Sequence, residues 1–435
     1  MLLLLVLIIL GCTLLVLLRV PIAFAFGIGA IVMMVVFDVD AQWAVTGSFR
    51  LILTFVFLAL SMYLMMGTFA GTAGIADRLS NFVVAAIGRI KGGLGVAVIV
   101  TNGIFGAISG TAMSALAGIG KAFLPSMSKE GYPVPYIAAL LCCSAVLALL
   151  IPPSGTMILF GFMGRLPISL CFLAPLIPGL ILIFLLSITH LTMARKIASI
   201  HVPPKVTLKV YGKELVQTVR DAFLGLILPV FVLGGIYGGF ITPVEAASFG
   251  VLYIFIVGFF IYRSIKPRGF LNDVLDVGLR IGSIIALIFF FMVLGRIFIM
   301  EKVSETILEM MFRVTDNPLG IMVMLNILML IMGMIIDDAS AMIITAIVLL
   351  PIARSIGFDP YHFAAIACVN LGIGLITPPV AALLYLAEAV FDTPVHTFIK
   401  GAFTYILFCY IPVLLLTIFF PQLSTTLPYL MMNIR

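Results

Sequence analysis

Long apolar runs separated by short polar segments extend along the whole of this chain. Ten of them approach the length of about 20 apolar residues that a helix needs to cross a bilayer. They fall near residues 1–18, 22–37, 48–70, 133–162, 168–192, 222–241, 245–262, 279–300, 361–390 and 400–420. The pattern predicts an all-α polytopic membrane protein.

Two further apolar regions, about 92–127 and 318–355, are too long for one span and are interrupted near the middle. The residues from Ser109 to Thr111 break the first region, and Asp337 breaks the second. A hydrophobic stretch broken at its centre is typical of a re-entrant helical hairpin. Irregular backbone inside a membrane is tolerated only where protein or water satisfies its hydrogen bonds. Each hairpin tip is therefore expected to be enclosed by protein or to face water.

The two halves of the chain repeat each other. With a shift of 226 residues, the Pro-Pro pair at 152–153 aligns with the pair at 378–379, and Ser144 aligns with Asn370. Prolines in register fix backbone breaks at equivalent places. Each half then contains five spans and one hairpin, and an odd number of spans inverts the second half in the membrane.

We therefore expect two inverted-topology repeats, 1–194 and 222–435, with broken helices at the midplane. A basic cytoplasmic segment, 195–221, would connect them. From Arg195 to Arg220 this loop holds six basic residues and one acid, and the next loop contains four basic residues (Arg263, Lys266, Arg268 and Arg280). Because basic loops stay in the cytoplasm, both loops are expected there, Lys205 is expected to be reachable only from that side, and both termini are expected in the periplasm.

Composition excludes several classes of protein. The chain has 435 residues, of which 63% are hydrophobic and 10% charged, whereas soluble domains have about 25% charged residues. The net charge of +6 is spread over loops and gives no case for nucleic-acid binding. No Gly-rich loop ends in Lys-Ser or Lys-Thr, so ATP hydrolysis by this chain is not expected. The six cysteines lie in apolar runs and are expected to be buried thiols.

Helix breaks at matching positions of inverted repeats point to a transporter's binding site. A tandem proline leaves upstream carbonyl groups free, and with nearby hydroxyl groups these are hard oxygen ligands suited to a sodium ion. The expected sodium ligands are Ser109, Gly110, Thr111, Pro152, Ser154, Asp337, Thr377 and Pro378. Helix N-termini at the same breaks favour an anion. The expected substrate-binding residues are Ser109, Ser154, Asn370, Thr377 and Pro379.

Several of these residues also have a purely structural interpretation. Tandem prolines kink helices without binding anything. Asp337 is costly in the middle of a membrane hairpin, which favours a cation ligand, and it would also cap the second arm of the hairpin. The side chains of Asn370 and Asn102 would equally well form hydrogen bonds between helices. Glu245, which follows Pro243, is expected to be an acid in the first turn of a helix.

Three motifs carry a resemblance to a known family. They are GAISGTA at 106–112 followed by IPPS at 151–154, GGIYGGFITPVEAA at 234–247, and GFDPYHFAAIACVNLGIGLITPPVAALLY at 357–385. Together they resemble the signatures of the large, DctM-type membrane subunit of TRAP (tripartite ATP-independent periplasmic) transporters, within the ion-transporter superfamily. Thr111 stands where the family often has Ser, and Ala381 replaces a frequent Gly.

The resemblance implies a secondary transporter of the bacterial inner membrane and no enzyme. A sodium gradient would drive uptake of an organic anion, such as a carboxylate or sugar acid, delivered by a periplasmic binding protein. Access would alternate by an elevator-type movement. A small four-helix membrane subunit would be a partner, and it is expected as a separate chain.

Three alternatives remain at the level of sequence. A stand-alone sodium/dicarboxylate symporter of the same superfamily would share the fold and the sodium site. An intramembrane enzyme would need a catalytic pair, and besides Asp337 and Asp338 none stands out within the spans. A scaffold protein would not need polar breaks at the midplane.

Overall fold

The computed structural model describes residues 2–18, 20–201, 207–379 and 381–434, and within these ranges it contains helices and no β-strand. Among the described helices, seven are long and apolar enough to cross a membrane, or up to nine if each of two bent helix pairs counts as one span. An all-α polytopic membrane protein is confirmed.

The helices of the first half follow the predicted runs closely. They are α1 (Leu2–Leu17), α2 (Ile22–Val36), α3 (Ala41–Ile52), α4 (Phe55–Thr72), α5 (Ile75–Ile87), α6 (Gly93–Ser109), α7 (Ala112–Lys129), α8 (Val134–Ala145), α9 (Leu147–Leu150), α10 (Gly155–Met163), α11 (Ile168–Leu173) and α12 (Leu176–Lys196).

The second half begins with α13 (Leu208–Tyr237) and includes three short π-helical segments. Its elements are α14 (Pro243–Ile256) with Val257–Ile261, α15 (Pro267–Met300), α16 (Val303–Phe312), α17 (Pro318–Ile335), α18 (Asp338–Ile344) with Thr345–Leu349, α19 (Leu350–Ser355), α20 (Pro360–Gly374), α21 (Ala382–Phe391), α22 (Val395–Tyr405) with Ile406–Tyr410, α23 (Ile411–Phe419) and α24 (Gln422–Ile434).

Local sequence explains where several helices begin. Thr242 and Glu245 form a capping box at the start of α14, in which the Glu245 carboxylate accepts the Thr242 N–H at 2.7 Å. This confirms Glu245 as an acid of the first helical turn. At α20, the Asp359 carboxylate accepts the N–H groups of Tyr361 and His362. Proline occupies the first turn of both helices, where its missing N–H costs nothing.

Two predicted loops are wrong in extent, because α13 and α15 begin well before the apolar runs at 222 and 279. The first turns of both helices carry charged residues, so the pattern of apolar runs alone does not predict where these helices begin. Of the predicted loop from 195 to 220, residues 195–196 lie in α12 and residues 208–220 lie in α13. Lys205 lies outside the described residues. Arg280, predicted to lie in a loop, lies inside α15.

Other differences concern helices that are not long apolar runs. The run predicted at 48–70 is divided between α3 and α4. Two amphipathic helices, α5 and α16, precede the two hairpins, and α24 follows the last apolar run. All six cysteines are free and buried, as predicted.

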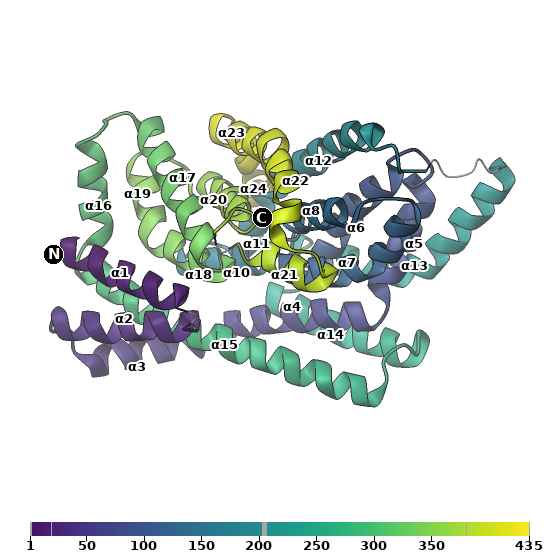
Figure 1. The fold of residues 1–435 in the computed structure, drawn as a ribbon. Coiled ribbons are helices and arrows are strands. Elements are labelled where there is room, and N and C mark those ends of the chain that lie inside the picture. The colour runs from purple at the N-terminus through teal and green to yellow at the C-terminus, as the bar shows by residue number, and fades with distance from the viewer. Residues whose placement is uncertain (1, 19, 202–206, 380, 435) are drawn as a thin grey trace.

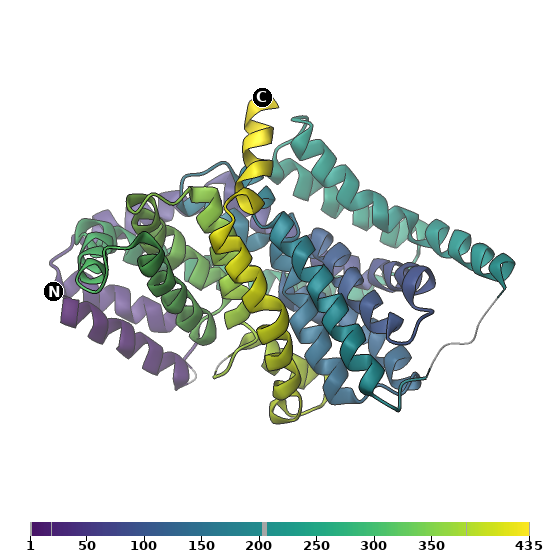
Figure 2. The same cartoon turned by 90° about the horizontal axis from the view of Figure 1, so that it is seen from above.

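The helices form two packed groups (Figure 1). In the outer group (α2, α3, α4, α14 and α15), the long α15 packs on α2, α3 and α4, and α14 packs on α4. In the inner group (α6–α10 and α17–α21), the hairpin arms pack on the broken helices, α6 on α8 and α9, and α17 on α20. Figure 2 shows α24 projecting away from the rest of the molecule at the C-terminal end.

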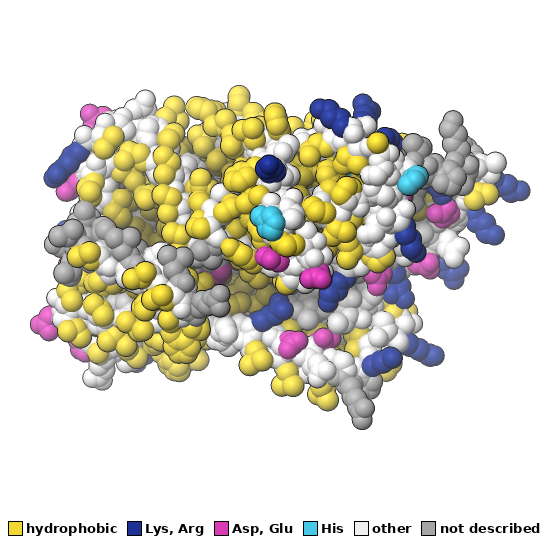
Figure 3. Space-filling model, viewed as in Figure 1, with side chains coloured by type: hydrophobic (Ala, Val, Ile, Leu, Met, Phe, Trp, Pro, Cys, Tyr) yellow, Lys and Arg dark blue, Asp and Glu magenta, His cyan; other side chains and the backbone are white. Residues whose placement is uncertain are grey.

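Charged side chains are distributed unevenly over the surface. In Figure 3, most of the visible Lys and Arg side chains lie at the end of the molecule where Figure 1 places α5, α12 and α13, together with some Asp and Glu side chains. The opposite end around α16 carries a few basic and acidic side chains. The last turn of α12 contributes Arg195 and Lys196 to the basic end, and Lys302 pairs with Glu305 at the other. Apolar side chains cover much of the face between the two ends.

Candidate functional site

The tip of the first hairpin is a short non-helical segment between α6 and α7. Gly110 ends α6 in the left-handed region with φ of 63°, where residues other than glycine are strained. Thr111 begins α7, and its hydroxyl group accepts the Ser114 N–H at 3.4 Å. Ser109 is fully buried beside it. The predicted break therefore occurs at the predicted residues.

The first double-proline segment lies against this tip. The chain leaves the helix at Ile151 and re-enters it at Gly155, with a cis peptide bond between Pro152 and Pro153. The Gly155 N–H donates to the Gly110 carbonyl oxygen at 3.0 Å. A Cβ atom added at Gly110 would lie 3.0 Å from the Pro153 carbonyl oxygen, so glycine is also needed for this close approach.

Two buried hydroxyl groups follow the proline pair. Ser154 and Thr156 lie 2.9 Å apart, oxygen to oxygen, and expose 1% and 4% of their surface. The structure thus brings together five predicted site residues on two segments that are distant in sequence, namely Ser109, Gly110, Thr111, Pro152 and Ser154.

The tip of the second hairpin supplies carboxylates. Asp337 begins α18, where its side chain accepts the Ser340 N–H at 3.2 Å and the Ser340 hydroxyl group. The predicted capping role of Asp337 is confirmed. Asp338 follows it, and both side chains are half-buried.

One cavity of about 470 Å³ connects these breaks. Gly110 and Thr111 of the first hairpin, Thr156 of α10, and Asp337 and Asp338 of the second hairpin all line it. Carboxylate and hydroxyl oxygens around one cavity are the ligand type that hard cations prefer. The volume lies within the range of about 300–1,000 Å³ of small-molecule sites.

The second double-proline segment does not line this cavity. The Thr377 hydroxyl group donates to the Ile373 carbonyl oxygen at 2.7 Å, and the Pro379 carbonyl oxygen accepts the Tyr385 hydroxyl group at 3.1 Å. The peptide bond between Pro378 and Pro379 is also cis. Three predicted site residues, Thr377, Pro378 and Pro379, are therefore not part of the cavity lining.

Asn370 is buried between helices of the inner group. Its side-chain amide donates to the Asn326 side chain at 2.7 Å and to the Asn326 carbonyl oxygen at 3.0 Å. In the first half, Asn102 of the hairpin donates to Ser144 of α8 at 2.7 Å. Each hairpin is thus tied to a broken helix by an equivalent polar contact, and in Asn370 the geometry favours the interhelical role.

Close backbone contacts also occur in both halves. A Cβ atom added at Gly106 would lie 2.6 Å from the Ala148 Cα, and one added at Gly374 would lie 2.6 Å from the Gly333 backbone. Position 148 is 226 residues before 374. In each half, a hairpin arm and a broken helix therefore approach so closely that at least one glycine is required between them.

The sequence reasoning missed Arg280, which also lines the 470 Å³ cavity. Arg280 stands directly before a long apolar run, and this pattern predicts a loop there. Pro267 offered a signal, because proline after a polar residue is typical of a helix start, and a helix from Pro267 contains Arg280. Thr156 and Ser283, which line the same cavity, were also missed, and no single pattern marks them.

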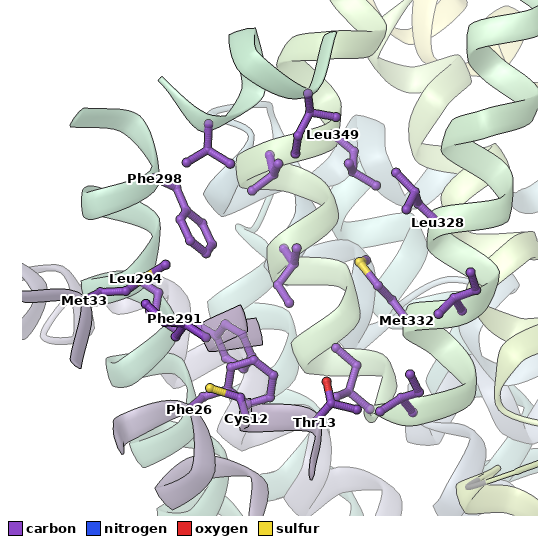
Figure 4. Close-up of a pocket in the computed structure, with 18 residues that line it drawn as sticks. Cys12, Thr13, Phe26, Met33, Phe291, Leu294, Phe298, Leu328, Met332 and Leu349 are labelled. Atoms are coloured by element: carbon purple, nitrogen blue, oxygen red, sulfur yellow. The ribbon is translucent and has the colours of Figure 1, made fainter. Parts of the chain in front are cut away.

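A second cavity, of about 310 Å³, is apolar (Figure 4). Phe26 of α2 and Phe291 and Phe298 of α15 point into it, opposite Met332 of α17 and Leu349 of the second hairpin. No charged side chain lines it among the described residues. An ionised acid would lose its hydration there without compensation, so this cavity is not the candidate substrate site.

Comparison with known proteins identifies the family. The family model of the DctM component of tripartite ATP-independent periplasmic transporters matches residues 9–423. The chain belongs to this family and is the large membrane component of a TRAP transporter. The family resemblance inferred from the motifs is confirmed, and the chain is a transport component and not an enzyme.

Two relatives agree with this assignment, and one solved structure has a similar fold. The sialic acid TRAP transporter large permease protein SiaM of Vibrio cholerae is 30% identical over 380 residues, which are 87% of each chain. The C4-dicarboxylate TRAP transporter large permease protein DctM of Pseudomonas aeruginosa is 31% identical over 375 residues, covering 85% of this chain and 86% of that protein. The fold is similar to that of the YdaH transporter of Alcanivorax borkumensis, with a TM-score of 0.64 and 14% identity over 88% of this chain and 90% of that one.

Proposed function

We propose that this TRAP permease uses a sodium gradient to take up an organic anion, a carboxylate or sugar acid, that a periplasmic binding protein delivers. The observation that carries the proposal is the cavity lined by both hairpin tips and by the start of α10, directly after the first double-proline segment. Oxygen ligands for a cation and space for a small acid occur there together. Two relatives are named for sialic acid and for C4-dicarboxylates, which supports the class of substrate.

The proposed sodium site has two parts. The first part would consist of Asp337, Gly110 and Thr111, which line the cavity, together with Ser109, directly before Gly110 in the chain, and the carbonyl groups around Pro152 and the Ser154 hydroxyl group, directly before the start of α10. Thr377 and Pro378 would form the second part of the sodium site, at the second double-proline segment. For the substrate we propose Ser109 and Ser154 beside the cavity, and Asn370, Thr377 and Pro379 in the second half.

The arrangement of the chain is proposed to be two inverted repeats, 1–194 and 222–435, each with five spans and one hairpin, joined through 195–221. The paired contacts Asn102–Ser144 and Asn370–Asn326 support equivalent halves. The basic end of the molecule supports a cytoplasmic side, with both termini in the periplasm. A sliding movement of the inner group against the outer group would alternate access.

The partners follow from the family, whose name describes a tripartite, periplasmic system. We propose a separate small four-helix subunit that packs on the outer group, and a periplasmic binding protein. The inner membrane of a bacterium is the proposed location.

Uptake by reconstituted vesicles tests the function. The permease, its small subunit and its binding protein are placed in vesicles, and uptake of succinate and sialic acid is measured with an inward sodium or potassium gradient. Uptake that requires both sodium and the binding protein is expected. Sodium-driven uptake without the binding protein would instead favour a stand-alone symporter, and uptake indifferent to sodium would contradict the proposal.

Labelling of a single cysteine tests the orientation. Lys209 is exposed at the start of α13, and the six native cysteines are buried, so Lys209→Cys offers one reactive thiol. An impermeant maleimide is expected to label it in inside-out vesicles and not in intact spheroplasts. Labelling in intact spheroplasts would reverse the proposed topology.

A further inference from the structure

Arg280 lies within α15 at the point where a charged first part, which contains Arg268, Asp273 and Asp276, gives way to the apolar part of the helix. α15 begins at Pro267 and its apolar part extends to Met300. A charged side chain next to an apolar span that faces a cavity is a candidate contact for a substrate or an ion. Arg280 is exposed and lines the 470 Å³ cavity together with Thr111, Asp337 and Asp338.

The guanidinium group of Arg280 has no partner among the described residues. Asp276 lies four positions earlier on the same helix, yet no ion pair joins them, since the ion pairs in the described chain are Arg89–Glu214 and Lys302–Glu305. By contrast, Arg296 of the same helix stacks on Trp43 and donates to its carbonyl oxygen at 3.0 Å. Arg280 therefore keeps its hydrogen-bond donors available to a molecule in the cavity.

Acidic and basic side chains both line the cavity. Asp337 and Asp338 are the acids among its described lining residues, and Arg280 is the one basic residue. A cation bound at the carboxylates leaves Arg280 as the group with opposite charge to an organic acid. A guanidinium group matches a carboxylate with two parallel hydrogen bonds, which lysine cannot reproduce.

We propose that Arg280 binds the carboxylate of the transported acid and makes the cavity selective for anions. The proposal rests on the proposed function, because it assigns a contact for the same substrate. It places this contact on α15 of the outer group, whereas the sodium ligands lie on the inner group. If the two groups slide against each other, the contact forms only while the cavity faces α15.

Transport kinetics test the first part of the proposal. Arg280→Gln is expected to raise the KM for the acid about tenfold or more, because a charge-assisted hydrogen bond is lost, and to leave the half-saturating sodium concentration unchanged. Arg280→Lys should restore part of the affinity. Arg296→Gln, on the same helix but outside the cavity, serves as the control. An unchanged KM in Arg280→Gln would overturn the proposal and leave Arg280 as a residue that only sets topology.

Thiol reactivity tests the second part without any transport. Ser283 lies one turn from Arg280 and also lines the cavity, so Ser283→Cys places a thiol there. Anionic and cationic methanethiosulfonate reagents are compared with and without Arg280→Gln. The ratio of anionic to cationic rate is expected to fall about fivefold or more when the arginine is removed, and an unchanged ratio would overturn the proposal. Because this ratio needs no substrate, it separates a failure at Arg280 from a failure of the proposed function.

Discussion

Asp337→Asn is expected to raise the sodium concentration needed for half-maximal uptake by about 10- to 100-fold. The substitution removes the charge from the cavity, and interactions of a charged ligand group are worth about 1.5–3 kcal/mol. Asparagine is as good a helix cap as aspartate, so the start of α18 is preserved. Uptake in vesicles, measured over a series of sodium concentrations, gives the result.

Asp359 provides a matched control for Asp337. It caps α20 through two backbone N–H groups in the way that Asp337 caps α18, but it does not line the cavity. Asp359→Asn is expected to leave the sodium dependence unchanged. If Asp337→Asn behaved like Asp359→Asn, Asp337 would be a helix cap and the sodium assignment would be wrong.

Gly374→Ala is expected to lower the stability of the protein by about 1–3 kcal/mol, the usual cost of overpacking, and to reduce transport. The new Cβ atom would lie 2.6 Å from the backbone of Gly333, so α17 and α20 must separate. This displacement reaches the second double-proline segment, which begins directly after α20. Thermal unfolding of the purified protein in detergent measures the loss as a lower Tm.

Gly71→Ala is the control for this substitution. Gly71 lies within α4, and nothing stands within 4 Å of a Cβ atom built there. Because alanine favours helix over glycine by about 1 kcal/mol, Gly71→Ala should keep or slightly raise the Tm. Equal Tm values for Gly374→Ala and the unsubstituted protein would show that α17 and α20 are not in close backbone contact.

Local sequence predicted the breaks in this structure well. Glycine at 110, tandem proline at 152–153 and aspartate at 337 each fix the backbone locally, so their consequences did not depend on the rest of the fold. The interhelical role of Asn370 was one of two interpretations, and its contact with Asn326 favours it.

Tertiary contacts were harder to predict. α13 packs on α5, and α15 packs on α2 to α4. Apolar periodicity does not record how far these helices extend beyond their apolar parts, and Pro267 is a local sign of the extension only for α15. The position of Arg280 at the cavity follows from the same packing. That the start of α10 lines one cavity with both hairpin tips, while Thr377 and Pro379 do not line it, is likewise a property of the assembled fold.

Sodium binding to the purified permease, measured with and without a saturating concentration of the transported acid, tests the central claim most directly. If one cavity holds both, the attraction between the cation and the carboxylate raises the affinity for each, and linkage makes the two factors equal. We predict tighter sodium binding in the presence of the acid, and loss of this effect in Asp337→Asn. Sodium binding that does not respond to the acid would contradict a shared site.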